Sequence, residues 1–280
     1  MRGIRRWMAL AMLAVLQACG GSGGSVPPPA EAYIKASNTA ADQWFGFATA
    51  VSADGSTMVV GAPQEDGMAT GINGDDKRQG ATDSGAVYVF VWNGLSWVQE
   101  AYIKPHKAQA GDKFGISVAI SADGNTLVVG APNEDGSGTG VNSTAADGAT
   151  DSGAAYVFVR NSGTWSQHAY LKASNAEAGD QFGIVAVSGD GNTVAVSAGR
   201  EDSASRIIDS GKSDNSLKDA GAVYVFSRSG TTWTEQAYLK ASNSGEGDTF
   251  GLAVRLSSDG DTLAVSAPFA RSDASRGAGQ

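Results

Sequence analysis

The sequence is poor in cysteine, histidine and basic residues. Its one cysteine, Cys19, lies near the N-terminus, so the rest of the chain has neither disulfides nor thiolate chemistry. Its two histidines, His106 and His168, have no metal-binding spacing, and no Ser-His-Asp order, phosphate loop or dinucleotide motif is present. A formal net charge of −9 argues against nucleic acid or an anionic membrane surface as a partner, because both require basic patches. Nothing in the sequence therefore marks a catalytic residue.

Apolar runs are short throughout, and the longest lies at the N-terminus. Basic residues Arg2, Arg5 and Arg6 precede an apolar stretch that is too short to span a bilayer as a mature helix. The stretch ends in Leu-Gln-Ala-Cys, which resembles a bacterial lipobox with Cys19 as the lipidated residue; the alternative is an ordinary secretory signal in which Cys19 is incidental. We expect residues 1–18 to be a signal peptide and 19–31 a Gly/Ser/Pro tether, giving a lipid-anchored protein of the bacterial cell envelope.

One sequence motif occurs four times at a spacing of about seventy residues, a period typical of repeat architectures. In residues 111–132 two short apolar runs are joined by Asp-Gly, opened by Phe-Gly and closed by Gly-Ala-Pro. Residues 32–280 divide into repeats of about 32–100, 101–168, 169–236 and a partial 237–280.

Each full repeat splits into four strand-like pieces and contains no long helical stripe. In the second repeat the pieces are residues 114–121, 126–130, 153–158 and 165–172. The middle pieces are almost continuously apolar, as strands covered on both faces must be. This pattern predicts an all-β fold, a β-propeller of four-stranded antiparallel blades, incomplete with three full blades plus part of a fourth. A β-solenoid and a string of separate sandwiches are the alternatives.

The recurring Phe-Gly and Gly-Ala-Pro steps resemble the FG-GAP repeat, as found in the integrin α-subunit propeller. The Phe-Gly signature residues are Phe45, Gly46, Phe114, Gly115, Phe182, Gly183, Phe250 and Gly251. The third repeat departs from the pattern because Gly199 replaces the proline. The resemblance implies a seven-bladed ring, so the sequence is interpreted as a truncated product or as an open arc that associates with another copy.

The Asp-Gly steps at Asp54, Asp123, Asp190 and Asp259 are interpreted as tight turns, because one carboxylate cannot supply the six to eight oxygen ligands of calcium. The acidic loops between the second and third strands are interpreted as solvated loops, in which Asp and Asn favour turns; the alternative is that they bind calcium, and any calcium is expected in these loops rather than at the Asp-Gly turns. The candidate ligands are Glu65, Asp66, Asp75, Asp83, Glu134, Asp135, Asp147, Asp151, Glu201, Asp202 and Asp219. The aspartates before Phe-Gly (Asp42, Asp112, Asp180 and Asp248) are expected to accept backbone hydrogen bonds, and the recurring tryptophans to pack.

Taken together, the sequence predicts a non-catalytic cell-surface binding or adhesion module. The loops of one propeller face are expected to bind an extracellular protein or glycan, as the integrin resemblance implies, with no nucleic-acid partner. An assembly protein that self-associates is the alternative, and a glycosidase-type enzyme the weaker one.

Overall fold

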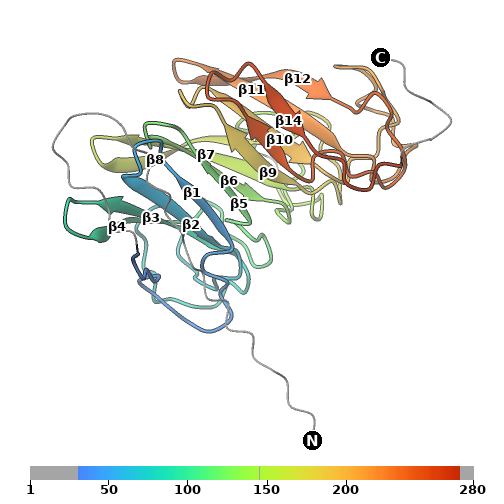
Figure 1. The fold of residues 1–280 in the computed structure, drawn as a ribbon. Coiled ribbons are helices and arrows are strands. Elements are labelled where there is room, and N and C mark those ends of the chain that lie inside the picture. Colours follow the sequence, from blue (N-terminus) through green and yellow to red (C-terminus); the bar gives the residue numbers. More distant parts are fainter. Residues whose placement is uncertain (1–30, 145, 272–280) are drawn as a thin grey trace, which may run out of the picture.

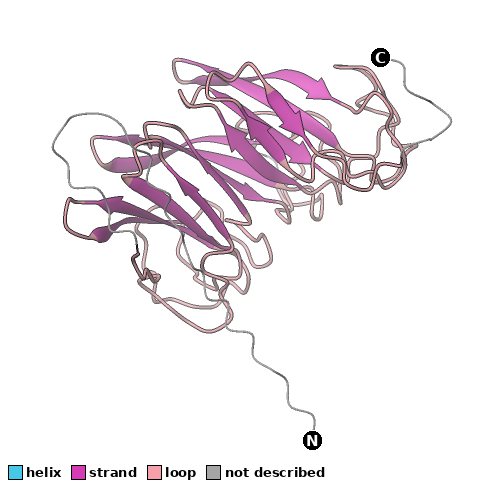
Figure 2. Cartoon of the chain, in the orientation of Figure 1, coloured by secondary structure: helices cyan, strands magenta, loops and turns pink. Residues whose placement is uncertain are grey.

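The computed structural model describes residues 31–144 and 146–271, and all the regular secondary structure in these residues is β (Figure 2). The first sheet has the order β1-β2-β3-β4, with every neighbouring pair antiparallel. Its strands are β1 (Ala48–Val51), β2 (Thr57–Ala62), β3 (Ala86–Trp92) and β4 (Trp97–Ile103).

Two more sheets repeat this order, and a hairpin follows them (Figure 1). The second sheet contains β5 (Ser117–Ile120), β6 (Thr126–Ala131), β7 (Ala154–Asn161) and β8 (Thr164–Leu171). The third contains β9 (Phe182–Val187), β10 (Thr193–Ala198), β11 (Ala222–Ser229) and β12 (Thr232–Leu239). The hairpin pairs β13 (Val254–Leu256) with β14 (Leu263–Val265). The predicted β-propeller fold is confirmed: the described residues form three four-stranded blades and two strands of another.

Successive blades pack face to face around their first strands. Strand β1 contacts β5, β5 contacts β9, and β9 contacts β13. The second strands β2, β6 and β10 are the most deeply covered, and every residue of β2 and β6 is buried. One apolar cluster joins residues of the first two blades and another joins the second and third. The almost continuous apolar character of these strands follows from coverage on both sides.

The Phe-Gly and Gly-Ala-Pro steps are the points at which neighbouring blades touch. A Cβ built on Gly130 would lie 1.7 Å from the carbonyl oxygen of Gly183, and one on Gly61 would lie 2.1 Å from that of Gly115. The phenylalanine of each step enters the core: Phe114 is fully buried and packs edge-on against Tyr156 and Phe158. The signature is therefore a blade-to-blade packing motif.

The third repeat makes the same turn without its proline. Glu201 N donates to Ala198 O at 3.3 Å, as Glu134 N does to Ala131 O at 3.2 Å. Ser197 stands where the first two repeats have Gly61 and Gly130, and its hydroxyl donates to Gly251 O at 2.6 Å. The departure at Gly199 therefore leaves the turn intact.

Changing Gly130 to alanine is expected to lower the free energy of unfolding by about 1–3 kcal/mol, because the new methyl group would overlap the backbone of the next blade. Chemical denaturation of the two proteins measures the difference. Gly199→Ala is the matched control, since nothing lies within 4 Å of a Cβ built there. An equal decrease in the free energy of unfolding for Gly130→Ala and Gly199→Ala would contradict the role of Gly130 in blade-to-blade packing.

Candidate functional site

The antiparallel strand order places two kinds of connection on opposite faces of the propeller. The Asp-Gly turns lie at one end of the strands. The connections between second and third strands lie at the other end, together with the connections from one repeat to the next. We call this second set the loop face; it comprises residues 35–47, 63–85, 105–116, 132–144, 146–153, 173–181, 199–221 and 241–253. Hydrogen bonds such as Gly111 N to Thr82 O (2.8 Å) and Gly179 N to Thr150 O (2.8 Å) join the two kinds of loop.

On the opposite face, the Asp-Gly aspartates are turn residues, as expected. The hydroxyl of Ser121 donates to Asp123 Oδ1 at 2.5 Å, and Asn125 N donates to the same oxygen at 3.0 Å. Partial burial raises the pKa of Asp123, but these hydrogen bonds outweigh it and leave the pKa below its usual value. The same serine bond recurs at Asp54, Asp190 and Asp259. Each carboxylate is thus used within its own turn.

On the loop face, the glutamates of the predicted calcium loops are held in a buried ion pair. Glu65 Oε2 accepts a hydrogen bond from Lys104 Nζ at 2.7 Å, and both side chains are fully buried. Lys104 also donates to Ser84 Oγ at 2.7 Å, and Tyr102 donates to Glu65 Oε1 at 3.1 Å. Burial lowers the pKa of Lys104, and the charge of Glu65 opposes that shift. Glu65 therefore ties its loop to the end of β4.

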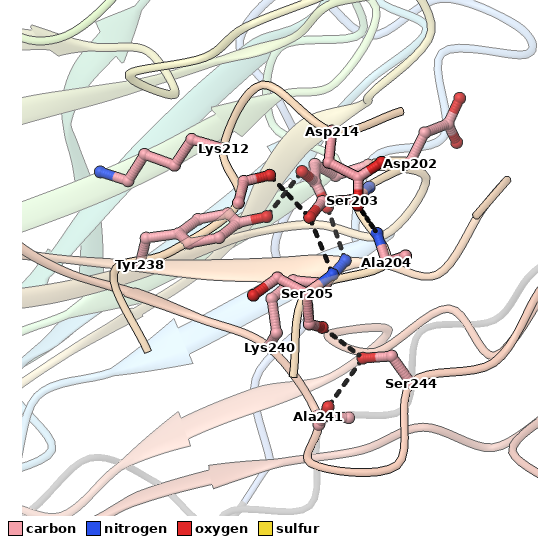
Figure 3. Close-up of polar contacts among 12 residues, drawn as sticks. Asp202, Ser203, Ala204, Ser205, Lys212, Asp214, Tyr238, Lys240, Ala241 and Ser244 are labelled. Carbon is pink, nitrogen blue, oxygen red and sulfur yellow. Dashed lines mark hydrogen bonds and ion pairs between the residues drawn. The ribbon is translucent and has the colours of Figure 1, made fainter. Parts of the chain in front are cut away.

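The ion pair recurs in the other two blades. Lys172 lies 3.0 Å from Glu134, and Lys240 lies 2.6 Å from Glu201. Figure 3 shows the third copy, in which Tyr238 and Lys240 point toward the same carboxylate. These lysines were not among the predicted site residues, although one follows each fourth strand. Their regular recurrence was the available signal.

The aspartates of the same loops close them through backbone bonds. Asp66 Oδ1 accepts from Asp83 N at 2.9 Å, and the carbonyl of Asp83 accepts from Lys113 N of the next repeat at 3.0 Å. Asp83 has a φ of 56°, a left-handed conformation that aspartate tolerates at turns. The pairs Asp135–Asp151 and Asp202–Asp219 make the same loop-closing bond.

Asp75 and Asp147 do not take part in these loop-closing hydrogen bonds. Asp75 accepts a bond from Lys77 N at 3.1 Å, and Asp147 is paired with Lys107 and accepts from Gln109 Nε2 at 2.8 Å. Within residues 31–144 and 146–271, no group of three or more His, Cys, Asp or Glu side chains is arranged to hold a metal ion. Calcium in these loops stays a prediction, which thermal melts with and without chelator would test.

The acids before Phe-Gly accept backbone hydrogen bonds in three repeats. Asp112, Asp180 and Asp248 accept from residues three positions earlier, at 3.0, 2.8 and 2.7 Å. In the first repeat the prediction for Asp42 was wrong, because Gln43 occupies the equivalent position and accepts from Ala40 N at 3.3 Å. Burial raises the pKa of Asp112 and of Asp180 to about 7, against the opposing effect of these hydrogen bonds.

The tryptophans pack between blades, as expected. Trp165 Nε1 donates to Glu100 at 2.8 Å, and Trp233 Nε1 donates to His168 Nδ1 at 2.9 Å. Burial and the nearby Arg228 lower the pKa of His168, which favours the neutral ring that accepts this bond. His168 therefore joins two blades.

A cavity of about 500 Å³ opens on the loop face of the second repeat. Glu134, Tyr156 and Tyr170 line it, with His106 and Gln167 beside them. Burial and the Glu134 carboxylate raise the pKa of Tyr170, so its phenol is protonated at neutral pH. Of the predicted residues, only Glu134 lines this cavity, and no sequence argument had paired it with the tyrosines.

The fold and the recurring inter-blade steps are those of an FG-GAP repeat propeller. The FG-GAP repeat family matches residues 30–90, 97–158, 165–226 and 233–280, and the chain belongs to this family. None of the curated proteins matches the chain.

Several solved structures are distantly similar. A putative 6-phosphogluconolactonase from Bacteroides uniformis has a TM-score of 0.46 and 13% identity, over 85% of this chain and 53% of that one. A hypothetical selenium-binding protein from Sulfolobus tokodaii has a TM-score of 0.34 and 9% identity, over 65% and 37%. A periplasmic gluconolactonase from Pseudomonas aeruginosa has a TM-score of 0.33 and 13% identity, over 78% and 64%. The chain thus spans about half the length of the first of these proteins and less than half the length of the second.

The predicted signal peptide, Cys19 and most of the tether lie outside the described residues. Among the residues described, no helix is long and apolar enough to cross a membrane.

Proposed function

We propose that this FG-GAP propeller is a non-catalytic binding module, anchored to the bacterial cell envelope by a lipid on Cys19, whose loop face holds an extracellular protein or glycan. The observation that carries the proposal is the cavity of about 500 Å³ in the loop face of the second repeat. Its size is that of an ordinary ligand pocket, and polar groups converge on an aromatic wall, as in many such sites.

The surrounding network supports binding because it holds the loops in place before a ligand arrives. Lys172 fixes Glu134 at the cavity wall through a bond of 3.0 Å and also donates to Ser152 at 2.6 Å. Asp135 closes the same loop through Asp151 N. A loop that is ordered in the free protein loses less conformational entropy on binding.

The direct test is an array of glycans and peptides probed with the full-length protein and with a rim variant, His106→Ala/Gln167→Ala. His106 and Gln167 line the cavity and bond each other at 2.9 Å, and His106 is exposed. We expect one ligand class to bind and the rim variant to weaken its binding at least tenfold. Lys77→Ala, an exposed change in the first repeat, is the control. Array ligands that bind the rim variant as tightly as the wild type would contradict the proposal.

Self-association is the second candidate. Trp44 and Phe47 stack with their ring centroids 5.6 Å apart on the first blade, and both are about half exposed. Apolar rings of this kind mark interaction surfaces when they gather. Light scattering decides between the two candidates, because a monomer at micromolar concentration would exclude the assembly.

Catalysis is the remaining alternative, with a carboxylate of the loop face as its acid. A panel of glycosides is expected to give no turnover. Turnover that is abolished by Glu134→Gln would overturn the non-catalytic proposal.

A further inference from the structure

The first and third repeats fill the cavity position with an asparagine. Asn38 Nδ2 donates to Glu65 Oε1 at 2.8 Å and to the carbonyl oxygen of Asp76 at 3.0 Å, and its Oδ1 accepts a bond from the Tyr88 hydroxyl. The carboxamide thus joins the buried glutamate, the tyrosine of the third strand and the backbone of the acidic loop.

The third repeat repeats this arrangement with Asn175. Its Nδ2 donates to Glu201 Oε1 at 3.2 Å and to Lys212 O at 2.9 Å, and the Tyr224 hydroxyl donates to its Oδ1 at 2.6 Å. Two independent copies of the network therefore use a carboxamide with the same donor and acceptor partners.

In the second repeat Lys107 takes the place of this asparagine. Its side chain pairs with Asp147, at the rim of the loop, and leaves the position open. Tyr156, the counterpart of Tyr88 and Tyr224, is only 1% exposed, yet its hydroxyl has no hydrogen-bond partner within residues 31–144 and 146–271. Ser143 Oγ is also buried without a described partner, and both residues line the cavity.

The charges at the site select a neutral group. Glu134 is paired with Lys172 at 3.0 Å, and Lys107, which also lines the cavity, is paired with Asp147, so neither an ammonium nor a carboxylate ligand would find an unpaired partner of opposite charge there. The Tyr156 hydroxyl lacks an acceptor, and the neighbouring Glu134 carboxylate lacks the amide donor that Asn38 and Asn175 supply in the other repeats. A ligand group that satisfies both must accept a hydrogen bond from Tyr156 and donate one to Glu134.

We propose that the second-repeat cavity binds a primary carboxamide, such as the side chain of a peptide asparagine or a small free amide, in the position that Asn38 and Asn175 fill in the other repeats. This assignment rests on the proposed binding function and names its ligand chemistry. The carboxamide NH₂ donates to Glu134, and its oxygen accepts from Tyr156. The cavity volume of about 500 Å³ exceeds one carboxamide, so the rest of the ligand lies against His106 and Gln167.

Saturation-transfer NMR with the full-length protein tests this directly. The probes are N-acetyl-L-asparagine methylamide, its aspartate analogue, and propionamide. We expect the asparagine probe to bind at least fivefold more tightly than the aspartate probe. If propionamide binds as tightly as the asparagine probe, small amides are ligands of the site. If propionamide binds more weakly, the peptide portion of the asparagine probe contributes to binding. Both outcomes support a carboxamide site.

The decisive variant is Lys107→Asn, which gives the second repeat the residue that the first and third already use. It should abolish asparagine-probe binding while the melting temperature is held or raised, and Lys77→Asn should change neither. Unchanged binding in the Lys107→Asn variant, or an aspartate probe that binds as tightly as the amide, would overturn the assignment. If array ligands still bind at the rim but the carboxamide probes do not, only this inference fails; if neither binds, the proposed function fails as well.

Discussion

Replacing Lys104 with methionine is expected to lower the free energy of unfolding by about 3–5 kcal/mol, because it leaves the carboxylate of Glu65 buried without its cation. Glu65 and Lys104 are both fully buried, so water cannot compensate for the lost charge. Only Asn38 and Tyr102, which donate to Glu65 Oε1 at 2.8 and 3.1 Å, would remain as partners of the carboxylate within the described residues. Urea denaturation followed by tryptophan fluorescence measures the effect.

Two further variants make the result specific. Lys77→Met removes an exposed lysine from the same repeat and should change the free energy of unfolding by less than about 0.5 kcal/mol. The double change Lys104→Met/Glu65→Leu removes both charges and should recover part of the loss. A single Lys104 variant as stable as the wild type would show that the pair does not hold the loop.

The protein is expected to lose stability as the pH rises from about 4 to 7. The pKa of Asp112 and that of Asp180 are raised to about 7, chiefly by burial, from a value of 3.8 for a free carboxyl. Between these two pH values the folded state holds protons that the unfolded state has released, so each group contributes about 1.4 kcal/mol of destabilisation per pH unit. Above pH 7 this contribution becomes constant. Melting temperatures recorded from pH 5 to 8 should therefore fall.

The double variant Asp112→Asn/Asp180→Asn should remove most of this slope. An amide oxygen still accepts from Gln109 N and Glu177 N, but the buried charge is gone. Asp123→Asn is the control, because the pKa of that turn carboxylate is lowered and it stays ionised across the same range. A melting temperature that rises from pH 5 to 8, or a double variant that keeps the wild-type slope, would contradict the burial argument.

The fold was predictable because its signals are local. Asp-Gly turns and apolar runs such as residues 126–130 each specify a hairpin within a few residues, and the repeat multiplies the signal. The strand predicted from Phe114 begins only at Ser117, because Gly115 has a φ of 94° and the step before it contacts the preceding blade. That contact lies between repeats, and no local pattern reveals it.

The site was less predictable because its partners are distant in sequence. Glu65 and Lys104 are 39 positions apart, and an acidic loop gives no indication that one of its carboxylates is buried. The difference between Lys107 and the asparagines of the neighbouring repeats was visible in the sequence. Its meaning depended on the bonds that Asn38 makes with Glu65 and the loop backbone, which only the structure supplies.

The scaffold and the site are therefore separate parts of each repeat. The Phe-Gly steps and the lysine–glutamate pairs are common to the three blades, Gly-Ala-Pro is present in the first two, and all of them serve packing. The second repeat keeps that scaffold and changes the one residue that would otherwise fill its cavity. We expect ligand selection to lie in that change.

A crystal structure of the full-length Lys107→Asn variant would show whether Lys107 keeps the second-repeat cavity open. We expect the introduced carboxamide to bridge Glu134 and Tyr156, as Asn175 bridges Glu201 and Tyr224, and to fill the position that is open in the wild type. A carboxamide that points to solvent, with the cavity still open beneath it, would contradict the account.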